Sequence, residues 1–245
     1  MTTLIKLEII RALRNKKFMF FSVIYPPALY LIIAGGADSK PIAGMKLDMG
    51  LYLMVSMAAF GAMTAVLLGN SERIAKEREK GWVRQLRLTA LPGRGYVAAK
   101  IAAAATVSLP SILLVMIVAA TVKGVRLEAW QWISIAAGTW LGSFVFAALG
   151  VAIGYLATGD SVRPIAMLFY FGLAFLGGLW MPLTILPQWV QDIAAWVPTH
   201  AYTALGTAVE AGEAPHVKDM AILAGYLLVF AGGAAWLYRK DTRKA

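Results

Sequence analysis

Residues 129–159 read AWQWISIAAGTWLGSFVFAALGVAIGYLATG and contain no Lys, Arg, Asp, Glu or His. A hydrocarbon core about 30 Å thick is crossed by about 20 apolar residues in helical form, so this stretch is long enough to span a bilayer. Five further stretches without a charged residue occupy 18–37, 49–71, 101–122, 164–191 and 220–238. The sequence therefore predicts an all-α integral membrane protein with six transmembrane helices.

The composition agrees with this class, because 60% of the residues are hydrophobic and only 15% are charged, against about 25% charged in soluble domains. We expect a single transmembrane domain over 1–245, with spans near 18–36, 50–69, 98–122, 130–157, 164–181 and 220–238. The first span is expected to be retained, because its apolar stretch exceeds that of a signal peptide. Cysteine is absent, which excludes disulfides and thiol chemistry.

The basic residues indicate the orientation in the membrane. Of the 23 Lys and Arg, 18 lie before the first span, after the second, after the fourth and after the last, and 5 lie in the alternate loops. Cytoplasmic loops carry the excess of positive charge, so both termini are predicted to be cytoplasmic. This topology accounts for the net charge of +10, and we expect a lipid partner and no nucleic acid.

The first residues form an amphipathic segment. Ile5, Ile9, Ala12 and Leu13 share one face of a helix over 3–17, and the basic residues lie mostly away from it. Such a segment can lie in the headgroup plane as an interfacial helix. The alternative is a plain cytoplasmic tail whose charges set the topology.

Two spans carry residues that predict special packing. Pro26 and Pro27 should make the first span kinked or irregular. The fourth span carries glycines at multiples of four residues, which permit close helix approach. Packing within the chain is the favoured use of this stripe and a dimer face the alternative. The stripe consists of Gly138, Gly142, Gly150 and Gly154.

The segment after the fifth span combines glycine, proline and tryptophan while remaining apolar. Prolines five residues apart cannot share one regular helix, and tryptophan is typical of membrane interfaces. We predict a helix that breaks near Pro182 and is followed by a re-entrant outer hairpin before the last span. The alternative is an ordinary surface loop. The residues of this predicted outer break are Gly177, Gly178, Pro182, Pro187 and Pro198.

Catalytic and metal-binding patterns are missing from the sequence. His200 and His216 have no HExxH spacing, and no phosphate-binding glycine loop is present. We therefore expect no catalytic residue, no metal site and no cofactor bound by this chain, which is not predicted to be an enzyme. The predicted spans also lack the ionisable residues that proton-coupled carriers use. A stand-alone secondary carrier or channel remains the alternative function.

The longest internal loop reads NSERIAKEREKGWVRQLRLTALPGRGYVAAK over 70–100. Residues 71–80 are strongly helical, with Glu72–Lys76 and Arg73–Glu77 pairs at i,i+4. A charged helix with a small apolar side suits docking into a groove on a cytosolic partner. It suits equally well a position on anionic lipid.

Residues of this loop resemble the cytoplasmic signature of type-two ATP-binding-cassette (ABC) permeases. The resemblance is carried by Glu-Arg-Glu-Lys-Gly over 77–81, then by Leu86, Thr89, Pro92 and Lys100. The glycine and proline residues of the predicted outer break are similar to the family's run before its last span. Trp82 departs from the pattern, since the family usually has Thr there. Six spans and an amphipathic start extend the resemblance over nearly the whole chain.

The resemblance implies the permease subunit of an exporter in a bacterial plasma membrane. Two copies of a separate cytosolic ATPase would bind ATP and Mg, and a second permease, as in a homodimer, would complete the pathway. The segment 77–92 would be a cytoplasmic coupling helix that contacts the ATPase, and the outer break would be the extracellular gate. The implied coupling residues are Glu77, Arg78, Glu79, Gly81, Trp82, Leu86 and Pro92.

The cargo implied by the resemblance and by the apolar, aromatic spans is hydrophobic or amphiphilic, drug-like or lipid-like, as in multidrug efflux. By analogy with the family, the first, second and fifth spans would line the substrate path. The residues expected there are Tyr25, Tyr30, Met54, Met57, Phe169 and Phe171.

Overall fold

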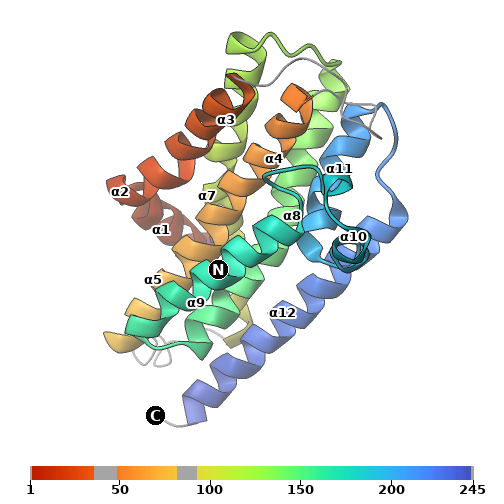
Figure 1. The fold of residues 1–245 in the computed structure, drawn as a ribbon. Coiled ribbons are helices and arrows are strands. Elements are labelled where there is room, and N and C mark those ends of the chain that lie inside the picture. Colours follow the sequence, from red (N-terminus) through yellow and green to blue (C-terminus); the bar gives the residue numbers. More distant parts are fainter. Residues whose placement is uncertain (1, 36–48, 82–92, 244–245) are drawn as a thin grey trace.

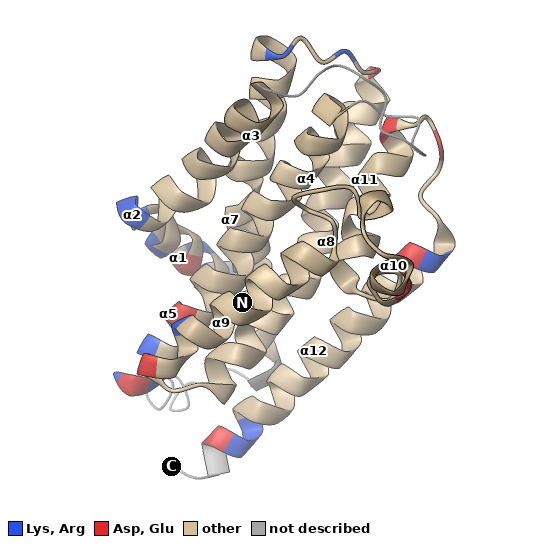
Figure 2. Cartoon of the chain, in the orientation of Figure 1, with Lys and Arg blue, Asp and Glu red and all other residues tan. Residues whose placement is uncertain are grey.

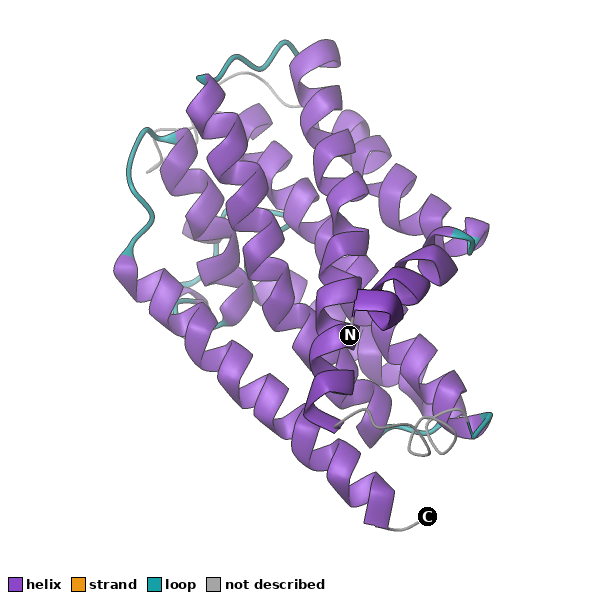
Figure 3. Cartoon of the chain, turned by 180° about the vertical axis from the view of Figure 1, so that it is seen from behind, coloured by secondary structure: helices purple, strands orange, loops and turns teal. Residues whose placement is uncertain are grey.

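The computed structural model describes residues 2–35, 49–81 and 93–243, and all regular structure within these ranges is helical (Figures 1 and 3). The first elements are α1 (Thr2–Leu13), α2 (Lys16–Met19) and the π-helical turn η1 (Phe20–Ile24). The next are α3 (Tyr25–Gly35), α4 (Met49–Met63), the π-helical turn η2 (Thr64–Leu68), α5 (Gly69–Glu79), α7 (Gly93–Val122) and α8 (Ala129–Leu156). The last are α9 (Gly159–Leu176), the short 3₁₀ helix η3 (Leu183–Ile185), α10 (Gln188–Ala194), α11 (Pro198–Glu210) and α12 (Val217–Arg243).

Five helical stretches in the described residues are long and apolar enough to cross a membrane. They are Lys16–Gly35, Met49–Glu79, Gly95–Val122, Ala129–Leu156 and Val217–Asp241, and they coincide with the predicted first, second, third, fourth and sixth spans. The predicted fifth span, 164–181, corresponds to α9, which ends earlier, at Leu176. Because its first turns carry Asp160 and Arg163, α9 has a short apolar length. Its crossing of the membrane stays a prediction.

The first span is irregular where its prolines predict it. Pro26 and Pro27 have no N–H to donate to the carbonyls of Ser22 and Val23, and the turn η1 directly precedes them. The hydroxyl of Ser22 donates to the Phe18 carbonyl at 2.8 Å. A π-helical turn at this point accommodates the carbonyls that the prolines leave without a regular partner, and the prediction of an irregular helix is confirmed.

Helix α8 lies at the centre of the bundle, in contact with α4, α5, α7, α11 and α12 (Figure 1). Its glycines allow this close packing: a Cβ on Gly150 would lie 2.7 Å from the Val66 carbonyl oxygen, and one on Gly142 would lie 2.3 Å from the Tyr202 ring. A Cβ on Gly154 would meet Ile74 at 2.8 Å. These positions of the glycine stripe therefore serve packing within the chain, as predicted.

The connection after α9 places its prolines at helix boundaries. Gly178 has a φ of +73°, a left-handed conformation that favours glycine. Pro182 and Pro187 immediately precede η3 and α10, and Pro198 is the first residue of α11. Proline suits a first helical position because its missing N–H would have no partner there. Helix α11 then packs against α4, α8 and α12.

Charged residues gather toward the ends of the described helices, and the middle of the bundle is free of them (Figure 2). One end carries α1, α2, the end of α5 and the last turns of α12 (Figure 2). The charges at this end come from segments that are far apart in the sequence, and they form the candidate site.

Candidate functional site

A buried ionic cluster joins three helices at the charged end of the bundle. The ammonium group of Lys100, on α7, lies 2.7 and 2.8 Å from the two carboxylate oxygens of Glu77, on α5, and 2.8 Å from Glu8 of α1. Lys100 is 1% exposed. Because one cation contacts two carboxylates from separate helices, Lys100 fixes α1 and α5 relative to α7.

Three further groups complete the cluster. Arg11 donates to Glu77 at 3.0 Å, and Arg73 lies 3.6 Å from Glu8. The hydroxyl of Tyr96 donates to Glu77 at 3.2 Å. Two carboxylates thus face three cations and one hydroxyl, which matches the rule that buried charges are retained when paired and hydrogen-bonded.

A second group of contacts holds the end of α12. Arg78 binds Asp241 through two nitrogens, at 2.7 and 3.3 Å, and donates to the carbonyls of Gly154 and Ala157 at 3.0 Å each. These carbonyls belong to the C-terminal end of α8, where a cation is favoured by the helix dipole. The Arg78 guanidinium also lies 5.4 Å from the centre of the Tyr155 ring. Arg78 therefore ties α5, α8 and α12 together.

The remaining predicted coupling residues divide between the end of α5 and the residues outside the described ranges. The Glu79 carboxylate lies against Gly159, the first residue of α9, where a Cβ would come within 1.6 Å of it. A helix N-terminus favours negative charge. Gly81 ends the segment with a φ of +69°. Trp82, Leu86 and Pro92 lie outside the described residues.

Sequence reasoning missed Glu8 as a member of this site, although a signal was present. Glu8 falls three residues after Ile5 and four before Ala12, so it lies on the apolar face of the amphipathic segment. Glu8 is 4% exposed and Ala12 is 1% exposed. A carboxylate on an apolar face indicates a buried cation opposite, and Lys100 is that cation.

The predicted outer break is held by contacts from two helices. The hydroxyl of Tyr52, on α4, donates to the Gly178 carbonyl, and Thr203, on α11, donates to the Gly177 carbonyl at 3.4 Å. A Cβ on Gly177 would lie 2.2 Å from that of Thr199. The two glycines thus let α9 end in close contact with α4 and α11.

One helical stretch links the outer break to the ionic cluster. Elements α4, η2 and α5 form a continuous helix over Met49–Glu79, with Tyr52 near one end and Glu77 near the other. At about 1.5 Å per residue, such a stretch exceeds the thickness of a hydrocarbon core. This helix therefore connects the two ends of the bundle.

The predicted substrate-path residues fall into two environments within the single chain. Tyr30, Met54 and Met57 are buried in the core, whereas Tyr25 and Phe169 are exposed. Phe171 is exposed as well, and its ring contacts those of Tyr170 and Trp180, at centroid distances of 5.2 and 5.9 Å. The exposed members lie on α3 and α9.

The histidines stand apart from any group suited to bind a metal. Within the described ranges, no cluster of three or more His, Asp or Glu side chains could hold a metal ion. His200 belongs to α11, outside the candidate spans, and burial lowers the pKa of its imidazole, an effect that Asp219 opposes. The lowered pKa favours the neutral imidazole of His200.

Comparison with known proteins gives matches along most of the sequence. The family model of the ABC-2 family transporter proteins matches residues 45–237. The chain is also 29% identical over 236 residues to the putative transport permease YvfS of Bacillus subtilis (strain 168), an alignment that covers 96% of this chain and 95% of that relative. Glu77, Lys100 and the outer break lie within the residues that the family model matches.

Proposed function

Because the chain belongs to the ABC-2 family of transporter proteins, we propose that it is the permease subunit of an ATP-driven exporter. A separate cytosolic ATPase subunit, in two copies, would bind ATP and Mg and hydrolyse the nucleotide. The permease would move a hydrophobic or amphiphilic compound, drug-like or lipid-like, out of the cell. The protein lies in a membrane that it crosses several times, and we assign it to a bacterial plasma membrane with both termini in the cytoplasm.

The observation that carries the proposal is the unbroken helix Met49–Glu79. At its inner end, Glu77 and Arg78 are tied to α1, α7, α8 and α12 by ionic and hydrogen-bonded contacts. At its outer end, Tyr52 holds the carbonyl of Gly178. A push from an ATPase on the residues after α5 would therefore reach the outer break, which would act as the extracellular gate.

A second permease, in our proposal an identical copy, would face α3 and α9. Large apolar side chains stand exposed on both helices, among them Ile32, Leu168 and Phe175. Phe21, in the turn η1 directly before α3, is exposed as well. Covering such a surface with a partner or with cargo is consistent with a pathway between two copies. Tyr25, Phe169 and Phe171 would then contact the cargo, and the buried Tyr30, Met54 and Met57 would support the wall.

Pull-down of the ATPase subunit tests the coupling segment. Gly81 and Gly124 both have positive φ, +69° and +66°, and a Cβ on either would meet nothing within 4 Å. Proline is incompatible with positive φ, so Gly81→Pro and Gly124→Pro disturb equivalent turns at opposite ends of the bundle. We expect only Gly81→Pro to lose the ATPase. Equal retention by both variants would contradict the coupling role.

Transport by reconstituted protein tests the energy source. Vesicles that contain the permease and its partner ABC ATPase should export a lipophilic dye or a fluorescent phospholipid only when ATP is present. A stand-alone carrier or channel would instead move the same probe without the ATPase, along a gradient or under a proton gradient. Uphill transport by the permease alone would refute the proposal.

A further inference from the structure

Helix α9 lies beside the helix Met49–Glu79, in contact with η2 and α5 (Figure 1). The hydroxyl oxygens of Thr64, the first residue of η2, and of Tyr170, on α9, lie 2.6 Å apart. The Tyr170 ring also packs on the ring of Phe60, with centroids 5.1 Å apart. Tyr170 is 3% exposed, so this side chain faces the neighbouring helix rather than cargo or lipid.

The direction of this hydrogen bond follows from a second contact of Thr64. Its hydroxyl donates to the Phe60 carbonyl at 2.8 Å, and a hydroxyl has a single hydrogen to donate. Tyr170 therefore donates to Thr64. Without the Thr64 hydroxyl, the buried Tyr170 O–H would lose its acceptor at a depth where hydrocarbon supplies no water to replace it.

The π-helical turn η2 gives this contact its register. The Gly69 N–H donates to the Thr64 carbonyl, five residues earlier instead of four, which inserts one extra residue. The eight residues from Thr64 to Glu72 would place these side chains about 80° apart around a regular helix, and the extra residue cancels most of this difference. Both therefore face α9, where Arg163 lies 3.6 Å from Glu72.

The bond between Thr64 and Tyr170 joins the two helices where other contacts contribute less. The side chains of Arg163 and Glu72 are 69% and 32% exposed, and exposed ion pairs contribute little. The hydrogen bond from Tyr52 reaches Gly178, which lies beyond the end of α9. A hydrogen bond within the spans is therefore the main polar tie between α9 and the helix Met49–Glu79.

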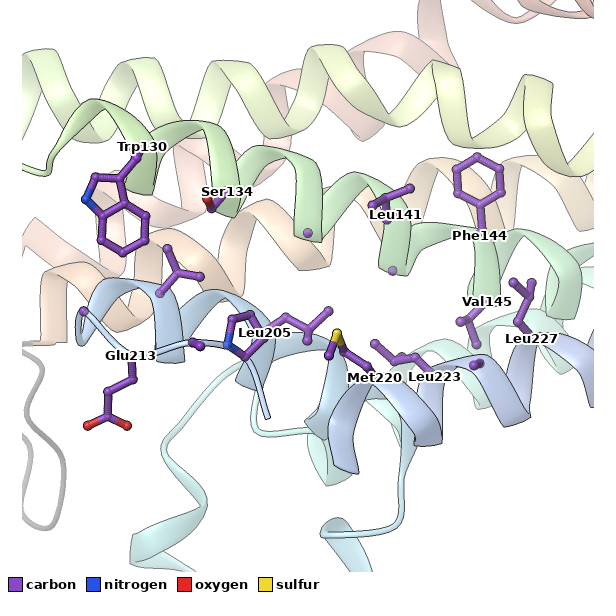
Figure 4. A pocket seen from close by; sticks show the side chains of 17 residues that line it. Trp130, Ser134, Leu141, Phe144, Val145, Leu205, Glu213, Met220, Leu223 and Leu227 are labelled. Carbon is purple, nitrogen blue, oxygen red and sulfur yellow. The ribbon is translucent and has the colours of Figure 1, made fainter. Parts of the chain in front are cut away.

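Another side of α8 is packed less closely. An apolar cavity of about 710 Å³ opens there between α8, α11 and α12, with Leu141, Leu205 and Leu223 among its lining residues (Figure 4). A close-packed interior resists displacement, so such a space permits α8 to shift against α11 and α12. The bundle can therefore yield on this side while α9 stays attached to the helix Met49–Glu79.

We propose that Tyr170, through its hydrogen bond to Thr64, fixes α9 to the helix Met49–Glu79, so that both helices move as one unit during transport. Tyr170 and Thr64 are positioning residues, because they act on cargo only through the surface that α9 carries. The inference rests on the proposed function, in which Phe169 and Phe171 of α9 contact the cargo and a push on the residues after α5 moves the helix.

Export per ATP hydrolysed tests the positioning role in vesicles that hold the permease and its partner ABC ATPase. Thr64→Val and Tyr170→Phe keep the side-chain shape and remove one hydroxyl each. Either should lower the export of nitrobenzoxadiazole-labelled phosphatidylethanolamine or of ethidium per ATP about threefold. This factor is equivalent to about 0.7 kcal/mol, close to the average for interhelical hydrogen bonds in membranes. The double variant should lose no more than either single variant, because both remove the same bond.

Thr106→Val is the matched control for the loss of a hydroxyl within a span. The Thr106 hydroxyl donates to the Ala102 carbonyl at 2.9 Å, the same contact that Thr64 makes with Phe60, and its loss should leave export per ATP unchanged. Thr64→Ser keeps the hydroxyl and should retain wild-type export per ATP. A merely structural role of the bond would lower export and ATP hydrolysis together, through the amount of folded protein, without changing their ratio.

A distance measurement tests the attachment of α9 without transport. The chain has no cysteine, so spin labels attach only at the introduced Lys76→Cys, on α5, and Leu168→Cys, on α9, where the native side chains are 67% and 73% exposed. Labelled chain diluted with unlabelled chain should give one narrow distance distribution, unchanged when Mg-ATP and vanadate trap the complex. In the permease alone, Tyr170→Phe should broaden this distribution and Thr106→Val should not.

The outcomes separate this inference from the proposed function. A distance that changes on trapping in the wild type would overturn the inference, as would equal distributions in the wild type and Tyr170→Phe. Equal export per ATP by Tyr170→Phe and Thr106→Val would overturn the positioning role. Wild-type vesicles that export neither probe with ATP would instead refute the proposed function, and the distances in the permease alone would then decide the attachment.

Discussion

Replacing Lys100 with methionine removes a cation that contacts both Glu8 and Glu77. Methionine keeps much of the volume, so the effect reports the charge. Breaking a buried ion pair by removing one partner costs about 3–5 kcal/mol. Lys100 pairs with two carboxylates, but the loss of unfolding free energy should stay within this range rather than double. The reason is that Arg11 still contacts Glu77 and Arg73 still lies near Glu8.

The free energy of unfolding in mixed detergent micelles measures this loss, with helicity as the signal. Lys76→Met is the matched control, because Lys76 is 67% exposed and pairs with Glu72 at 3.7 Å, an exposed pair of the kind worth only about 0.3–0.5 kcal/mol. The double variant Lys100→Met with Glu77→Gln should recover about 0.5–3 kcal/mol of the summed single losses. If Lys100→Met and Lys76→Met lose the same stability, the cluster does not hold α1 and α5.

Three further predictions concern the helix contacts. Gly150→Ala should destabilise the fold by about 1–3 kcal/mol, since its Cβ would meet the Val66 carbonyl oxygen. Gly225→Ala, a control in open space, should stabilise the fold by up to ~1 kcal/mol. Equal unfolding free energies of the two variants would refute the packing argument. Tyr52→Phe should cost about 1–3 kcal/mol by leaving the Gly178 carbonyl without its donor, and an unchanged unfolding midpoint would contradict this. Gly178→Trp should abolish export while the ATPase is still pulled down. Gly172→Trp, at a position with no neighbour within 4 Å, serves as the control. Unchanged export by Gly178→Trp would contradict the role of the outer break as a gate.

The sequence predicted the features that depend on local chemistry. Long uncharged stretches located five candidate spans, because the length of an apolar run must match the bilayer. Pro26 and Pro27 predicted the irregular first span, because proline has no backbone N–H to donate to the carbonyl four residues earlier in a helix. The glycine stripe predicted close packing of α8, and Gly142, Gly150 and Gly154 pack closely whereas Gly138 does not.

The features that the sequence did not predict depend on tertiary contacts. The π-helical turn η2 has no proline to mark it, and Gly150 packs against the backbone carbonyls of Val66 and Leu67 there. The second span was expected to end near residue 69, where polar and charged residues begin. Residues 71–80 were predicted to be helical, but not as a direct continuation of the second span. Charge marks the edge of the membrane but does not end a helix, so one helix runs on to Glu79. Likewise, the partner of Glu8 is 92 residues away in sequence, at Lys100.

The position of the ionic cluster gives it a mechanical consequence. Charges buried in pairs resist separation, because each partner left alone would carry its full desolvation cost. Glu77 and Arg78 are neighbours on α5, yet they hold opposite sides of the bundle: Glu77 binds α1 and α7, and Arg78 binds α8 and α12. A tilt of the helix Met49–Glu79 would therefore move these elements with it rather than break the contacts. At the other end of this helix, the hydrogen bond from Tyr52 to the Gly178 carbonyl would pass such a tilt to the outer break.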